Sequence, residues 1–102
     1  MKYYDLTKDA ENDLREVARY TLNKWRKEKL QEYRVGLKNT FRAIGQNEMI
    51  RHSFSTVFPE LLVTKYKYHF IFYLNNDFEK PVIIGVIHEK RDIVNRLTER
   101  LS

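Results

Sequence analysis

The segment Tyr68–Leu74 constrains the fold of this 102-residue chain most strongly, because it is apolar or aromatic at almost every position. A strand with one face in water would alternate apolar and polar side chains. We therefore expect a central strand that is covered on both faces. Two further apolar runs, Leu61–Tyr66 and Val82–Ile87, are expected to be its neighbours in the sheet. The chain has room for one domain, residues 1–102.

The first half of the chain has helical spacing instead. Thr7 offers a hydroxyl group as the N-cap of a first helix. The apolar face of this helix is expected to contain Ala10, Leu14, Val17, Ala18, Thr21 and Trp25. After a break at residues 26–28, a second helix is expected to present Leu30, Tyr33, Leu37, Phe41 and Ile44, with Gly45 as its C-terminal cap. Two amphipathic helices with so short a connection must pack as an antiparallel hairpin.

The remaining segments complete an α+β fold. Tyr3–Leu6 is expected to be an edge strand, and Asn75–Asp77 has turn chemistry. The connection 46–59 is expected to be irregular, with Phe54, Val57 and Phe58 tucked against the core. Helical spacing returns after His88 at Ile93, Leu97 and Leu101. The prediction is an N-terminal strand and helical hairpin packed on a small, mostly antiparallel sheet, with a short C-terminal helix.

Composition limits the compartment and the partners. The chain has no cysteine, no signal peptide and no apolar run long enough to span a membrane, so we expect a cytoplasmic protein without disulfides. The formal net charge is +5, and the excess lies mainly between residues 27 and 47. The cations of that segment are Lys27, Lys29, Arg34, Lys38 and Arg42. Either a solvated helix face or a surface for an acidic partner explains this excess.

Signatures of catalysis or cofactor binding are absent from the sequence. The histidines His52, His69 and His88 share no metal-ligand spacing, and three glycines cannot build a phosphate-binding loop. Asp9 and Asp13 are spaced i, i+4 and are expected on an exposed helix face. We therefore expect no metal, no cofactor and no small-molecule substrate.

Two polar clusters remain as candidate sites. Lys65, Lys67 and His69 would share one sheet face if a strand ran straight through them, but a turn near Lys67 would separate them. The segment His88–Asp92 follows the last strand, where functional residues are often placed. It also reads as a helix start in which Asp92 pairs with Arg96.

Taken together, these segments resemble the ParE/RelE toxins of bacterial toxin–antitoxin pairs, nearer the ParE branch. Leu6-Thr7, Ala10, Asp13-Leu14, Tyr20-Thr21 and Trp25 look like the first helix of that family, and Tyr33, Leu37 and Phe41 like its second. His69 followed by Phe70-Ile71-Phe72-Tyr73 is similar to its His-Val-Ile-Phe-Tyr strand. The run from Ile84 to Asp92 looks like its Ile-Leu-His-x-x-x-Asp ending.

The resemblance implies one of two activities. RelE-like members cut mRNA on the ribosome with clustered cations, several of which would fall here on Glu60, Leu62 and Glu89. ParE-like members bind DNA gyrase and trap its cleaved-DNA complex without chemistry of their own. We therefore expect a gyrase inhibitor rather than an enzyme. Its target-binding residues would be His88, Lys90, Arg91, Asp92 and Arg96.

Two alternatives stay open at this point. A ribosome-dependent ribonuclease would use Lys65, Lys67, His69, His88 and Arg91. A non-toxic relative would only bind the antitoxin.

The resemblance also implies a cognate, acidic, ParD-like antitoxin that folds along the hairpin. Arg34, Lys38 and Arg42 lie at i, i+4 and i+8 on the second helix and would steer such a chain.

Overall fold

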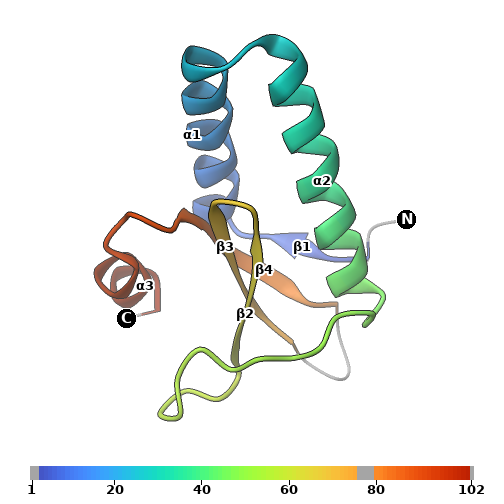
Figure 1. The fold of residues 1–102 in the computed structure, drawn as a ribbon. Helices are drawn as coiled ribbons and strands as arrows, with labels where there is room; N and C mark the ends of the chain where they lie inside the picture. Colours follow the sequence, from blue (N-terminus) through green and yellow to red (C-terminus); the bar gives the residue numbers. More distant parts are fainter. Residues whose placement is uncertain (1–2, 76–79, 102) are drawn as a thin grey trace.

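A computed structural model of the chain describes residues 3–75 and 80–101. Its elements in chain order are β1 (Asp5–Leu6), α1 (Lys8–Lys24), α2 (Lys27–Gly45), β2 (Leu61–Tyr66), β3 (His69–Leu74), β4 (Val82–His88) and α3 (Ile93–Leu101). Helices α1 and α2 form a hairpin beside the sheet, and α3 follows β4 at the C-terminal end of the described chain (Figure 1). The α+β class, the hairpin and the short C-terminal helix are thus confirmed.

The four strands form one sheet in the order β1-β4-β3-β2. Strand β3 lies between β2 and β4 and pairs antiparallel with both. The edge strand β1 pairs with β4 in parallel, so the sheet is mixed rather than purely antiparallel. Strand β1 is also shorter than expected, because only Asp5 and Leu6 pair with β4. Beyond Ile83, this edge of β4 is therefore not covered by β1.

Strand β3 is covered on both faces, as its composition predicts. Ile71 and Tyr73 belong to a core that includes the inner faces of α1 and α2. Phe72 belongs to a second core on the opposite face, together with Leu97 of α3. These three β3 side chains are almost completely buried. The alternation of a strand therefore joins the two layers of the protein.

The ends of the helices agree only partly with expectation. Thr7 is the N-cap of α1, and its Oγ1 accepts the Ala10 N–H at 3.1 Å. The expectation that Gly45 caps α2 is wrong, because the left-handed residue is Asn47, with φ 59°. Gly45 is instead a point of close approach, since a Cβ there would lie 2.4 Å from the carbonyl oxygen of Tyr3.

The connection between α2 and β2 also departs from expectation. Phe54 packs edge-on against Phe72, with ring centroids 5.1 Å apart. Val57 is 89% exposed and Phe58 is 40% exposed, so the expectation that they are tucked against the core is wrong. Instead, the segment follows the edge of β2 through backbone hydrogen bonds, such as the one from the Phe54 N–H to the Leu61 carbonyl. In the expected turn at residues 75–77, positions 76 and 77 lie outside the described residues.

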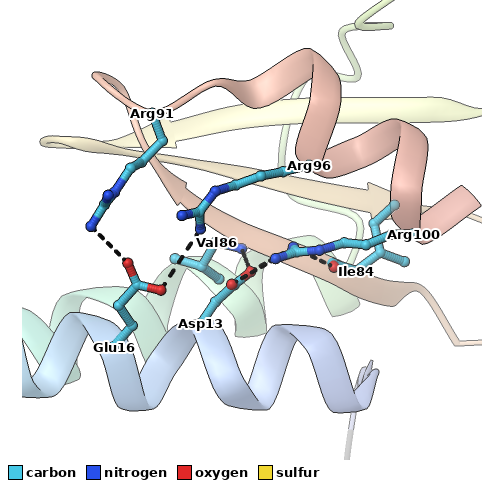
Figure 2. A network of polar contacts seen from close by, with 7 residues as sticks. All are labelled: Asp13, Glu16, Ile84, Val86, Arg91, Arg96 and Arg100. Carbon is cyan, nitrogen blue, oxygen red and sulfur yellow. Dashed lines mark hydrogen bonds and ion pairs between the residues drawn. The ribbon is translucent and has the colours of Figure 1, made fainter.

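The expectation that Asp13 lies on an exposed helix face is wrong, because its side chain is buried. Its carboxylate accepts two hydrogen bonds from Arg100 of α3, at 2.7 and 2.8 Å (Figure 2). The same carboxylate accepts the backbone N–H of Val86 in β4 at 2.9 Å. This N–H lies beyond the part of β4 that pairs with β1. Asp13 therefore binds a backbone group that the sheet leaves unpaired.

The Asp13–Arg100 pair lies over a β-bulge in β4. Phe72 pairs with Gly85 and Tyr73 pairs with Ile83, so Ile84 is the extra residue. Its carbonyl accepts Arg100 Nη1 at 3.2 Å. A Cβ on Gly85 would lie 2.7 Å from that same nitrogen, which explains a glycine at this position. Burial by itself lowers the pKa of Arg100, but the Asp13 carboxylate outweighs it and raises that pKa.

Removal of Asp13 should destabilise the protein strongly. Asp13→Ala leaves the Arg100 guanidinium half-buried and the Val86 N–H without its acceptor, so we expect a loss of about 3–5 kcal/mol in the free energy of unfolding. Arg100→Ala should cost a similar amount. The double variant should cost clearly less than the sum, because both changes remove one shared interaction. Urea unfolding measures all three variants.

Arg91→Ala is the matched control for this double-mutant cycle. It breaks an exposed ion pair with Glu16 and should cost less than about 1 kcal/mol. An Asp13→Ala variant that loses no more stability than this control contradicts the role given to the buried pair.

Candidate functional site

A hollow of about 260 Å³ lies between α1, the end of β4 and the start of α3. We call it the His88 hollow. It is lined by Asp13, Glu16, Val17, Tyr20, His69, Val86, His88, Lys90, Arg91 and Arg96. Four of the five predicted target-binding residues thus lie around one concavity. The lining also contains Glu16 and Tyr20, which were not among the predicted target-binding residues.

Cations outnumber acids at the open side of this hollow. Glu16 binds Arg91 at 3.0 Å and lies 3.7 Å from Arg96, so one carboxylate serves two guanidinium groups (Figure 2). Lys90 is exposed, and among the described residues no ion pair with a carboxylate is formed by its side chain. The rim therefore carries a net positive charge.

The fifth predicted residue, Asp92, has a structural role. Its carboxylate accepts the Asn95 N–H at 3.3 Å and the Asn95 side-chain amide at 2.7 Å. It thus caps the start of α3 rather than lining the hollow. The alternative pairing of Asp92 with Arg96 is wrong, since the Arg96 side chain reaches Glu16 of α1.

His88 is held by its own loop. Its Nδ1 accepts the backbone N–H of Lys90 at 3.1 Å, so a neutral His88 ring carries its hydrogen on Nε2. The ring also contacts Tyr20 of α1 and His69 of β3 edge-on, at centroid distances of 5.9 and 5.1 Å. His88 therefore connects the rim of the hollow to its floor.

His69 forms that floor and is hydrogen-bonded. Its Nδ1 lies 2.5 Å from Tyr33 Oη, and the Tyr33 hydroxyl donates to the Tyr66 carbonyl at 3.2 Å. Both contacts are satisfied together when His69 carries its hydrogen on Nδ1. Burial, followed by the neighbouring His88, lowers the pKa of His69 to about 4. Burial also raises the pKa of Tyr33 to about 12. Both groups are thus neutral near neutral pH.

The residues of the nuclease alternative do not form one cluster. His69, His88 and Arg91 line the His88 hollow. Lys67 lies in the turn between β2 and β3, with φ 50°, and its Nζ lies over the Tyr66 ring. Lys65 pairs with Phe70 in the ladder, whereas His69 pairs with Tyr66, so Lys65 and His69 point to opposite faces of the sheet. The idea of a shared face is therefore wrong.

Lys65 is also engaged by an acid. Its Nζ lies 2.6 Å from the Glu89 carboxylate. The hydrogen bond from Lys65 is the largest cause of a lowered pKa at Glu89.

A larger, open groove of about 710 Å³ lies between α1 and α2. We call it the hairpin groove. It is lined by Leu14, Arg15, Val17, Ala18, Arg19, Leu30, Tyr33, Arg34, Leu37, Lys38 and Phe41. Its floor is aliphatic and aromatic, and four cations border it. Two of these, Arg34 and Lys38, belong to the predicted antitoxin-binding set.

Arg42, the third member of that set, lies just beyond the groove. It lines a neighbouring hollow of about 560 Å³ with Tyr4, Glu11 and Lys38. Lys38 therefore borders both concavities. Arg34, Lys38 and Arg42 are all exposed, and within residues 3–75 and 80–101 none of them forms an ion pair. The structure thus arranges the three predicted cations in a row along α2.

Two searches of the described residues bear on other kinds of site. None of the described helices is both long and apolar enough to cross a membrane. No group of three or more His, Asp or Glu side chains is arranged to hold a metal ion in the described part of the chain.

Acid should destabilise the fold through His69. Below a pH of about 6.5, the unfolded chain protonates this ring, whereas the folded chain resists protonation until about pH 4. The unfolded state then binds the extra proton, so the free energy of unfolding falls as the pH is lowered through this window. His69→Asn keeps a hydrogen-bonding group near Tyr33 but does not titrate.

We therefore expect the stability advantage of the natural chain over His69→Asn to shrink between about pH 7 and pH 4.5. Urea unfolding in pH steps measures it, and His52→Asn, at an exposed histidine, is the matched control. A constant difference across this range contradicts the assignment of His69 as a buried neutral ring.

Comparison with known proteins gives one family. The model of the family described as "ParE toxin of type II toxin-antitoxin system, parDE" matches residues 4–93. The chain is 31% identical over 102 residues to a protein named Toxin ParE from Escherichia coli, covering 100% of this chain and 99% of that protein. The matched region includes both helices of the hairpin, the whole sheet and the loop that carries Lys90 and Arg91. The chain therefore belongs to the ParE family of toxins from type II toxin–antitoxin systems.

Proposed function

We propose that this toxin acts by binding rather than by catalysis, and that it inhibits DNA gyrase by trapping the cleaved-DNA complex. Binding rather than catalysis is supported by one observation: the residues that a ribonuclease would use do not all lie together. Lys65 is paired with Glu89 on one face of the sheet, and His69 is neutral and hydrogen-bonded on the other. A phosphoryl-transfer site would need convergent positive charges at the developing negative charge. The gyrase target is supported by membership of the ParE family.

The proposed target-binding surface is the cationic rim of the His88 hollow. Lys90, Arg91 and Arg96 lie on a loop and a helix start that the Asp13–Arg100 pair holds against α1. The surface combines charge with a fixed backbone. Such an arrangement suits recognition of a protein–DNA complex, whose DNA phosphates present negative charge. Asp92 contributes to this surface by shaping the loop rather than by contact.

The purified chain should inhibit supercoiling of relaxed plasmid by gyrase and should cause cleaved DNA to accumulate after protein denaturation. The double variant Lys90→Glu, Arg91→Glu reverses the charge of the rim and should weaken inhibition about tenfold or more. Lys8→Glu, an exposed lysine at the start of α1, is the matched control and should inhibit normally.

Other outcomes of this experiment separate the alternatives. Unaffected supercoiling together with codon-phased mRNA cuts in translating ribosomes, abolished by His69→Ala, would replace the gyrase proposal by the nuclease. Unaffected supercoiling together with no growth arrest on overexpression would favour a non-toxic relative.

We further propose that an acidic antitoxin segment occupies the hairpin groove. The groove offers an apolar floor for the anchoring side chains of an amphipathic segment, and its cationic border complements acidic residues. Arg34, Lys38 and Arg42 extend that border along two helical turns of α2. Their lack of ion-pair partners within the described residues leaves these charges available to a partner chain.

Charge reversal along this row should slow antitoxin association. The double variant Arg34→Glu, Lys38→Glu is expected to lower the association rate about tenfold at low salt, because exposed charges act mainly on the rate of encounter. The effect should shrink as salt screens the charges. Surface-based kinetics with the cognate antitoxin measures the rate, with Lys8→Glu as the control. An unchanged association rate at low salt contradicts the placement of the antitoxin.

A further inference from the structure

A second hollow, of about 160 Å³, lies where the end of α1 and the start of α2 face the turn between β2 and β3. We call it the tip hollow. Six aromatic rings line it: Tyr20, Trp25, Tyr33, Tyr68, His69 and His88. They come from both helices of the hairpin and from the sheet. Tyr20, His69 and His88 also line the His88 hollow, whereas Trp25 and Tyr68 belong neither to the binding surfaces proposed above nor to the hydrophobic core.

Three of the rings are exposed although they are large. Trp25 is 51% exposed, Tyr68 is 56% exposed and Tyr20 is 45% exposed. Trp25 follows the last turn of α1, where its backbone N–H still bonds to the Thr21 carbonyl. The deeper rings are rigidly held, since His69 is bonded to Tyr33. The hollow therefore has a fixed aromatic floor and exposed aromatic walls, which suits a flat ring system.

The charges around the tip hollow select the kind of ligand. Lys29 and Lys67 line it, and Lys24 lies next to Tyr20, with its Nζ 3.1 Å from the hydroxyl oxygen. The one acid in the lining, Glu32, lies 3.6 Å from Lys29, so three lysines face one carboxylate and the surroundings keep a net positive charge. An aromatic pocket with a cationic border disfavours a cationic ligand and favours an anionic one.

We propose that the tip hollow binds one unpaired nucleobase of a single-stranded nucleic acid, with its flanking phosphates on Lys24, Lys29 and Lys67. Base stacking on aromatic side chains combined with lysine contacts to the backbone is the general mode of single-strand recognition. A duplex is not expected to bind in the hollow, because its bases are already stacked and paired and cannot stack on the aromatic side chains. The shared chemistry fits DNA and RNA, so the strand type is a result of the experiment. This inference does not depend on gyrase.

The only tryptophan of the chain, Trp25, reports binding directly. A single-stranded oligonucleotide of about twelve residues, as DNA and separately as RNA, should quench Trp25 fluorescence in the purified full-length chain. The same sequence as a blunt duplex should quench much less. Preference for one of the two single strands identifies the natural source.

Variants of the walls should act on affinity without affecting the fold. Tyr68→Ala should weaken binding about fivefold or more, as expected for the loss of one stacking partner. Lys67→Asn keeps a residue that tolerates the left-handed backbone and should lower the salt dependence of log affinity by about 0.7. Phe58→Ala removes an exposed aromatic ring that does not line the hollow and should bind normally. Urea unfolding verifies that each variant is folded.

Three results would overturn the proposal. The first is no quenching by either single strand at low salt. The second is a Tyr68→Ala variant that is folded and binds as well as Phe58→Ala. The third is quenching by a poly-glutamate peptide as strong as that by nucleic acid, which would assign the hollow to an acidic protein segment. Loss of binding in Tyr68→Ala together with normal gyrase inhibition would support a site separate from the gyrase surface.

Discussion

The buried ion pair between Asp13 and Arg100 holds α3 against α1 and β4. It connects α1, the bulged part of β4 and α3. Helix α3 otherwise contacts the sheet mainly through Leu97 and Ile93. Such apolar contacts allow a short helix to slide, whereas a bidentate pair that also binds two backbone groups of β4 allows one position. The loop that bears Lys90 and Arg91 precedes α3, so its position depends on the same pair.

The distribution of charge follows from this geometry. Three arginines of the C-terminal segment face two acids of α1, which leaves the rim of the His88 hollow cationic. On the other face of the sheet, Glu89 neutralises Lys65. Along α2, Arg34 and Lys38 have no such partners among the described residues. The basic excess is therefore divided between the hairpin and the end of β4, which gives a small protein two separate surfaces for partners.

The aromatic residues serve both packing and recognition. Edge-to-face contacts run from Tyr66 through Tyr33, His69 and His88 to Tyr20, and so connect both helices of the hairpin to three strands. Burial keeps His69 neutral, which makes it a structural imidazole in this chain of rings. Trp25 and Tyr68 extend the same surface outward into solvent. A rigid interior thus supports an exposed aromatic wall.

The sequence predicts a helix or strand correctly where the spacing of apolar residues within that element decides its conformation. Apolar spacing predicted α1, α2 and the three long strands, since periodicity reflects which face is buried. In the structure, Asp13 lies between Ala10 and Val17 on the buried stripe of α1. The expectation of an exposed Asp13 failed because a carboxylate is buried only when a partner is present, and Arg100 is 87 residues away. The expectation that Trp25 belongs to the apolar face of the first helix is wrong, because α1 ends at Lys24 and the Trp25 side chain is 51% exposed.

The sequence by itself thus determined the α+β class, the hairpin, the central strand and the cationic row on α2, because each depends on local periodicity. The tertiary structure alone decided which distant side chains meet. It separated Lys65 from His69 by a turn at Lys67, placed Asp92 in a helix cap, and gathered aromatic rings from the hairpin and the sheet around one hollow. The physical reason is that strand register and helix packing act over long sequence separations, which no local pattern encodes.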